Sequence, residues 1–224
     1  AGSFIILVRH PETEKNRTHS RGGGPKDDIP TEQGRRESAV VSSALLAFCS
    51  ALPSCCCISV YSSASPRAQE VAEGLAREVR SRVVVDYRLG PMENGPVAGI
   101  SAREIAKERP EYYRQLMLFR RGLMSSYDLD HPGESARTHE VRAMAAFGMI
   151  EEVECSVAVV FSHKSTIGAA VVNYARRYCG YPKDFYGYVE IPTGSVSVVS
   201  PLRRTVWFVG AEVAALNSLV NATA

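Results

Sequence analysis

The sequence predicts an α/β protein with three layers (α/β/α), in which helices cover both faces of a mostly parallel central sheet. Short apolar runs at residues 4–8 and 156–161 fit strands that are buried on both faces. Amphipathic helical patterns separate these runs, as expected of strand–helix–strand units. The chain has 224 residues, of which 45% are hydrophobic and 22% charged, and it is therefore long enough to bury a substantial core.

The expected elements alternate along the chain. Strands are expected at residues 4–8, 57–61, 83–85, 156–161, 186–191, 195–199 and 205–209, and helices at 31–51, 66–80, 101–124, 134–154 and 165–178. Thr31 is suited to cap the first helix and Pro66 to occupy the first turn of the second. Pro110 is expected to break the third helix into two pieces, and Gly180 to end the last. The first helix is expected to bury one stripe: Ala39, Val40, Ser43, Ala44, Ala47 and Phe48.

Residues 1–224 are expected to form one domain with a helical cap insertion at about residues 90–130. No uninterrupted apolar run of about 20 residues occurs, which predicts that no helix spans a membrane. The formal net charge of +2, from 26 basic and 24 acidic residues, argues against nucleic acid or a membrane surface as partner. Whether the chain forms a homodimer, and whether a targeting segment was removed before Ala1, stay open.

The six cysteines include three in succession, Cys55, Cys56 and Cys57. They lack the Cys-x-x-Cys or Cys/His spacing that is typical of a metal site. We therefore expect reduced, mostly buried thiols and a cytoplasmic location.

Polar residues follow three of the predicted strands at their carboxyl ends. Arg9 and His10 follow the first strand, a segment ending in Arg67 follows the second, and His163 and Lys164 follow the strand at residues 156–161. Each segment alone is common on protein surfaces, but ligands of open α/β sheets bind where such strand ends converge. Guanidinium groups match phosphate oxygens two at a time, and two helices that begin here add their positive dipole ends. The sequence therefore predicts a small cationic site for a phosphoryl group.

These segments also resemble a known family. The run Arg9-His10-Pro11-Glu12-Thr13 is similar to the Arg-His-Gly-Glu-Thr motif of the histidine phosphatase (phosphoglycerate mutase-like) superfamily. The segment from Ser62 to Ala68 resembles its second arginine motif, and Ser162-His163-Lys164 resembles its Ser-His-Gly motif. Weaker similarities at residues 28–34 and 132–135, the latter to the phosphatase branch, keep the order of the family over about residues 4–200.

The resemblance implies a metal-independent phosphatase that needs no cofactor and hydrolyses phosphomonoesters through a phosphohistidine on His10. It implies that His163 and an acid take part in catalysis. We expect Glu93 to be the acid that protonates the leaving group, with Glu12 and Glu134 as weaker candidates. The residues expected around the phosphate are Arg9, Asn16, Arg67, His163 and Lys164. The expected partner is a small phosphorylated substrate or a phosphopeptide.

The sequence departs from the family pattern at several positions. Pro11 and Lys164 replace glycines, Lys15 stands in the place of a Trp, and the glycines after Glu93 are about two residues closer than usual. Lys164 is either an additional contact for the substrate or a solvent-facing side chain. Two alternatives therefore stay open beside the phosphatase. One is a phosphoglycerate mutase, and the other is a catalytically inactive module that binds phosphate.

Overall fold

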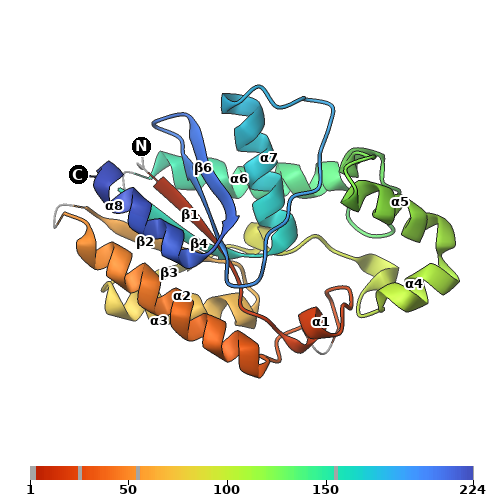
Figure 1. The fold of residues 1–224 in the computed structure, drawn as a ribbon, viewed down its shortest axis with the longest axis horizontal. Coiled ribbons are helices and arrows are strands. Elements are labelled where there is room, and N and C mark those ends of the chain that lie inside the picture. Colours follow the sequence, from red (N-terminus) through yellow and green to blue (C-terminus); the bar gives the residue numbers. More distant parts are fainter. Residues whose placement is uncertain (1–3, 25–26, 54–55, 154–155, 224) are drawn as a thin grey trace.

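The computed structural model of the protein describes residues 4–24, 27–53, 56–153 and 156–223. Its six-stranded sheet has the order β3-β2-β4-β1-β5-β6 (Figure 1). The strands are β1 (Phe4–Arg9), β2 (Ile58–Ser62), β3 (Val83–Val85), β4 (Val157–Ser162), β5 (Val196–Ser200) and β6 (Thr205–Ala211). The first four run parallel to one another, β5 is antiparallel to β1, and β6 is antiparallel to β5. The mostly parallel α/β sheet is thereby confirmed.

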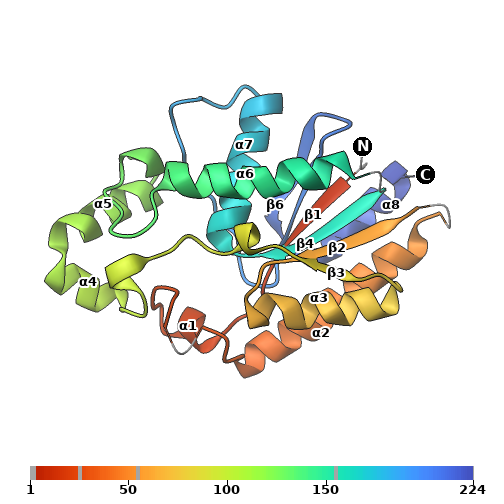
Figure 2. The ribbon, with the colours of Figure 1, turned by 180° about the vertical axis from the view of Figure 1, so that it is seen from behind.

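Helices cover both faces of this sheet, as Figures 1 and 2 show. One face packs against α2 (Glu32–Ala51), α3 (Pro66–Glu78) and the C-terminal pair η4 (Val213–Leu216) and α8 (Asn217–Thr223). The other face packs against α6 (Ala136–Glu152) and α7 (Lys164–Tyr178). The three-layer arrangement is therefore confirmed, with one apolar core on each side of the sheet.

The strand register places the polar segments side by side. Arg9, the last residue of β1, pairs with Ser162, the last residue of β4. The backbone N–H of His10 donates to the carbonyl of Ser162 at 3.1 Å, and that of Ser63 donates to the carbonyl of Phe161 at 3.1 Å. The segments that follow β1, β2 and β4 therefore leave the sheet at the same level.

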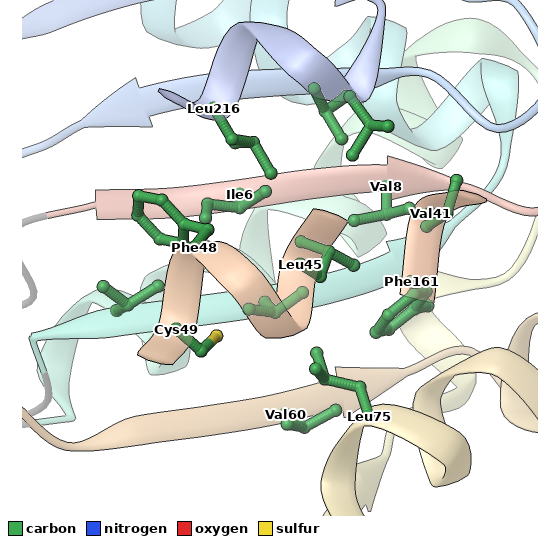
Figure 3. Close-up of a cluster of buried hydrophobic side chains, with 14 of the residues drawn as sticks. Ile6, Val8, Val41, Leu45, Phe48, Cys49, Val60, Leu75, Phe161 and Leu216 are labelled. Carbon is green, nitrogen blue, oxygen red and sulfur yellow. The ribbon is translucent and has the colours of Figure 1, made fainter. Parts of the chain in front are cut away.

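The buried stripe of α2 differs from the one expected. Val41, Leu45 and Phe48 face the core, together with Ile6 and Leu75 from β1 and α3 (Figure 3). The side chain of Val40, by contrast, is 59% exposed. The expected stripe was wrong because the helix is rich in Ala and Ser, so that two stripes fit a helical period and burial of the larger side chains selects between them.

The local signals for helix ends are confirmed. The hydroxyl of Thr31 accepts from the N–H of Gly34, and Pro66 opens α3. Pro110 begins a new helix, so that α4 (Ala102–Glu108) and α5 (Pro110–Arg120) replace one long element. Gly180 has a φ of +71° directly after the end of α7, which is the backbone conformation that glycine adopts most easily.

The predicted strand at residues 186–191 is wrong, because this segment has no regular structure. Its backbone groups form hydrogen bonds with residues outside the sheet. The N–H of Tyr186 donates to Ser125 Oγ, and its carbonyl accepts from the N–H of Ser126, both at 2.9 Å. The short helix α1 (Glu14–Arg17) and the C-terminal α8 were not expected. Three further 3₁₀ turns are η1 (Tyr87–Leu89), η2 (Gly95–Val97) and η3 (Ser126–Asp128).

The helices α4 and α5 lie beyond α1, at the end of the molecule toward which β1 points (Figures 1 and 2). They have a small apolar cluster of their own, formed by Val97, Ile105 and Tyr112. This cluster is separate from the two cores that cover the sheet. Within the described residues, no helix has the length and apolarity that crossing a membrane requires.

Most of the described cysteines are not buried. Cys49 is buried, Cys57 and Cys179 are exposed, and Cys56 lies between these extremes. The expectation of mostly buried thiols is therefore wrong for this set. Cys55 and Cys155 lie outside the described residues.

A close approach of α2 to the segment after β1 gives a test of the fold. A Cβ atom on Gly34 would lie 1.9 Å from the carbonyl oxygen of Glu12, whereas a Cβ on Gly74 in α3 would meet nothing within 4 Å. We expect Gly34→Ala to lower the free energy of unfolding in urea by about 3 kcal/mol. The matched control Gly74→Ala is expected to raise it by up to about 1 kcal/mol. Equal effects of the two substitutions would contradict this packing.

Candidate active site

His10 emerges from the end of β1 with its ring buried. Its Nδ1 lies 2.8 Å from the carbonyl oxygen of Pro11, and since a carbonyl only accepts, Nδ1 carries the hydrogen. The other nitrogen, Nε2, therefore has a free lone pair in the neutral ring. The carbonyl of Pro11 makes this contact, so the absence of a backbone N–H at this position removes nothing that His10 uses.

His163 lies beside His10, with 5.1 Å between the two ring centroids. Arg67 Nη2 donates to its Nδ1 at 3.3 Å, which leaves the hydrogen on Nε2. This Nε2–H donates to Ser63 Oγ at 2.8 Å. His163 is therefore held as a neutral ring between two partners. Ser63 lies in the segment that resembles the second arginine motif, but nothing in the sequence singled it out as the partner of a histidine.

Both rings resist protonation. Burial lowers the pKa of His10 well below its ordinary value of 6.5, and the nearby charges of Arg67, Arg9 and Lys15 lower it further. The pKa of His163 is also well below its ordinary value. Burial is the main cause, and His10 and the same three cations lower it further. A charged imidazole here would be desolvated and would face like charges. His10 is therefore a neutral base at physiological pH.

Arg9 and Arg67 are buried cations whose charges act on both rings. Arg9 donates to the carbonyl of Ile191 at 2.5 Å, and Arg67 donates to Asp28 Oδ1 at 2.9 Å. Burial lowers the pKa of Arg9 to about 10, which still leaves it a cation at pH 7. The Nε atoms of both arginines are buried and have no hydrogen-bond partner within the described residues. Buried donors of this kind are rarely left unpaired, and an anion with several acceptor oxygens would pair them.

Asn16 and Lys15 come from α1, the short helix that follows His10. Asn16 Oδ1 accepts from the backbone N–H and the hydroxyl of Thr13 at 3.0 and 2.9 Å, so its amide NH₂ is the group left to donate to a ligand. The side chain of Lys15 is half-buried. Burial, then the charges of Arg67 and Arg9, lowers its pKa to about 8. From the sequence, Lys15 was noted only as a residue that replaces the Trp of the family, and it was not expected to belong to the site.

Two expected site residues have other contacts. Lys164 Nζ lies 2.6 Å from the hydroxyl of Tyr188 and 2.7 Å from Glu190 Oε1, so its charge is largely matched within the protein. The side chain of Glu93 is exposed, while its backbone N–H and carbonyl bond to Glu134. Their expected roles in phosphate binding and proton transfer stay predictions.

The two weaker candidates for the acid, Glu12 and Glu134, both form side-chain contacts within the protein. Glu12 Oε1 accepts from the hydroxyl of Thr31 at 2.7 Å. Glu134 forms an ion pair of 2.7 Å with Arg142, and only 9% of its side chain is exposed. Of the three carboxylates, Glu93 is the one whose side chain is open to solvent.

A surface cleft of about 470 Å³ lies between α2 and α3 and reaches the segment 11–13. Its walls include Arg67 and Asp28 but neither His10 nor His163. The cleft therefore does not coincide with the site predicted from the sequence, where His10 and His163 lie. Among the residues that the structure describes, no group of three His, Cys, Asp or Glu side chains is arranged to hold a metal ion.

The sequence matches a known protein family. A family model described as the histidine phosphatase superfamily, branch 1, matches residues 5–212. No curated protein matched the sequence.

Several solved structures share the fold. A mycobacterial glucosyl-3-phosphoglycerate phosphatase in complex with inorganic phosphate is 17% identical, with a TM-score of 0.75 over 95% of this chain and 99% of that one. A putative alpha-ribazole-5'-P phosphatase from Escherichia coli is 19% identical, with a TM-score of 0.71 over 95% and 98% of the two chains. A structure described as mycobacterial hydrolase 1 is 18% identical, with a TM-score of 0.74 over 94% and 99%.

The low pKa values of the buried histidines predict how stability depends on pH. His10 and His163 stay neutral in the native state, whereas in the unfolded chain they bind protons below pH 6.5. The pKa values of His131 and His139, lowered to about 4 by burial, act in the same direction. The unfolded state therefore binds more protons, and the free energy of unfolding falls from pH 7 to pH 5 by up to about 1.4 kcal/mol per pH unit for each such histidine.

His163→Gln should flatten this slope by about one proton, measured by urea unfolding at several pH values between 5 and 7. The matched control is His19→Gln, at an exposed position, which should keep the slope of the parent. A slope in His163→Gln equal to that of the parent would show that His163 is not held neutral.

Proposed function

The chain belongs to the histidine phosphatase superfamily, and we propose that it hydrolyses phosphomonoesters through a phosphohistidine intermediate on His10. One observation carries this proposal. His10 is neutral with its lone pair on Nε2 and is close enough to Arg9 and Arg67 for their charges to lower its pKa, and the buried Nε atoms of both arginines have no partner in the described protein. This combines a nucleophile with donors that can hold the group it attacks.

In the first step, Arg9, Arg67 and the amide of Asn16 bind the phosphoryl oxygens. Nε2 of His10 attacks phosphorus, and the bond from phosphorus to the ester oxygen breaks as the P–N bond forms. The ring becomes positively charged as it is phosphorylated, and the Pro11 carbonyl at 2.8 Å from Nδ1 stabilises that charge. The departing alkoxide takes a proton from the carboxylic acid of Glu93.

In the second step, water attacks the phosphohistidine. The carboxylate of Glu93, now deprotonated, takes a proton from that water as its oxygen bonds to phosphorus. The P–N bond breaks, inorganic phosphate leaves, and His10 returns to its neutral form. In the free protein the Nε2–H of His163 donates to Ser63 Oγ at 2.8 Å. With substrate bound, it donates instead to a phosphoryl oxygen.

The part of the substrate beyond the ester oxygen would meet the cap, residues 90–130, which comprises α4 and α5. The backbone N–H of Arg21 donates to the carbonyl of Ile100 at 3.0 Å and so joins the loop after α1 to this segment. Because α4 and α5 have their own apolar cluster, their surface can vary without disturbing the sheet. We propose that this cap selects among small phosphomonoesters or phosphopeptides.

The first test of this function is the chemistry of His10. We expect an acid-labile phosphoenzyme to accumulate with an aryl phosphate substrate, with release of phosphate, and both to be lost in His10→Ala. His19→Ala is the control, since this histidine is exposed. Incubation with 3-phosphoglycerate and its bisphosphate activator separates the alternatives. Isomerisation without net release of phosphate would instead identify a mutase, and a folded protein with neither turnover nor phosphoenzyme would be a binding module.

The second test concerns Glu93. Glu93→Gln should slow the hydrolysis of alkyl phosphates by about a hundredfold or more, because their leaving groups require a proton. Aryl phosphates, whose leaving groups are weaker bases, should slow far less, and Glu108→Gln at an exposed position of α4 should change neither. Equal slowing of both substrate classes by Glu93→Gln would remove this residue from the role of acid.

A further inference from the structure

Lys15 carries a charge that the protein does not match directly. Its ammonium group has no hydrogen bond and no ion pair within 4 Å among the described residues, although the side chain is half-buried. Asp27 contributes a favourable charge. The carboxylate of Asp27, however, already accepts from the N–H groups of Gly23 and Gly24, and lies 3.7 Å from Arg67. A partly desolvated ammonium in this state has donors available for a ligand.

Arg21 is a second cation on the same side. Its Nη2 donates to the hydroxyl of Tyr112 at 3.4 Å, and its guanidinium lies 5.9 Å from the centre of that ring. No carboxylate of the described residues lies within ion-pair distance of it, and its charge is one of those that lower the pKa of Lys15. Arg21 directly precedes Gly22, and a Cβ atom on Gly22 would lie 3.8 Å from Lys15 Nζ. An anion at this place would therefore be attracted by both cations.

Lys15 Nζ lies near the loop at Gly22, which contacts the segment that carries the proposed acid Glu93. A Cβ atom on Gly22 would lie 3.8 Å from Lys15 Nζ and 3.5 Å from Asn94 Nδ2. Asn94 donates to the carbonyl of Gly22 at 3.2 Å and follows directly after Glu93. Lys15 therefore lies between the histidines, whose pKa values it lowers, and the segment that carries the proposed acid.

We infer that Lys15, together with Arg21, forms a second anion subsite, and that the substrate is a phosphomonoester with a further negatively charged group on its leaving-group side. This inference rests on the proposed function and deepens it. Arg67 forms an ion pair with Asp28 at 2.9 Å, whereas Lys15 and Arg21 have no ion pair among the described residues. These two cations are therefore available to a carboxylate or a second phosphate. Ion pairs in such partly desolvated surroundings are stronger than exposed ones.

The test compares substrates that share a short carbon chain. 3-Phosphoglycerate carries a carboxylate, propane-1,3-diol bisphosphate carries a second phosphate, and glycerol 3-phosphate carries neither. We expect the parent to prefer one or both of the first two in kcat/KM. Lys15→Met should reduce that preference by about tenfold or more, mainly through KM. Lys15→Arg should keep it, and Lys107→Met, at an exposed position of α4, should behave as the parent.

Two results would overturn the inference. One is an equal loss of kcat/KM for all three substrates in Lys15→Met, which would place Lys15 on the reacting phosphoryl group. The other is the absence of any preference in the parent. Whether Lys15→Met loses more kcat/KM on 3-phosphoglycerate or on propane-1,3-diol bisphosphate tells whether a carboxylate or a phosphate fits the subsite.

A binding measurement separates this inference from the proposed function. 3-Phosphonopropionate and propylphosphonate are not hydrolysed and differ in one carboxylate. By calorimetric titration, the parent should bind the first more tightly, and Lys15→Met should lose about tenfold or more of that difference. If the parent turns over no phosphomonoester but shows this difference, the proposed catalysis fails and the subsite stands. If it hydrolyses phosphomonoesters but binds both phosphonates equally and does not prefer propane-1,3-diol bisphosphate to glycerol 3-phosphate, the subsite fails and the catalysis stands.

Discussion

The site depends on one electrostatic constraint, which is that two buried imidazole rings must stay neutral among several cations. His10 and His163 lie 5.1 Å apart, and Arg9, Arg67 and Lys15 all oppose their protonation. Neutrality fixes the hydrogen-bond pattern, because each ring then has one donor and one acceptor nitrogen. The carbonyl of Pro11 takes the donor of His10, and the lone pair on Nε2 is left facing the place where charge is unmatched.

Loops from distant parts of the chain hold the cations that impose this constraint. Asp28, from the loop before α2, binds Arg67, and the carbonyl of Ile191 binds Arg9. The approach of α2 to the segment after His10, which a Cβ on Gly34 would block, keeps Thr31 against the Glu12 side chain. Each strand end therefore contributes a side chain, while the loops decide where that side chain is held. The donors left over at Arg9 and Arg67 are those that an anion can use.

The sequence predicted the layers, the strand ends and most helix limits, because these depend on local patterns. Apolar runs, the Thr31 cap and the break at Pro110 each act within a few residues. What could not be predicted depends on contacts between distant residues. The segment 186–191 alternates like a strand, but its bonds go to Ser125 and Ser126. The partners of Arg9 and Arg67 lie 182 and 39 residues away, and no spacing rule relates such pairs. Lys15 has an unusual charge environment only because the fold brings Arg67 and Arg21 near it.

The central claim is that the phosphoryl group passes through His10 before it reaches water. The stereochemical course at phosphorus tests this most directly, with a substrate made chiral by oxygen isotopes and turned over in isotopically labelled water. Each in-line displacement inverts the configuration, so two successive displacements through a phosphohistidine restore it. The account predicts overall retention. Overall inversion would show a single attack by water on the substrate and would contradict a covalent role for His10.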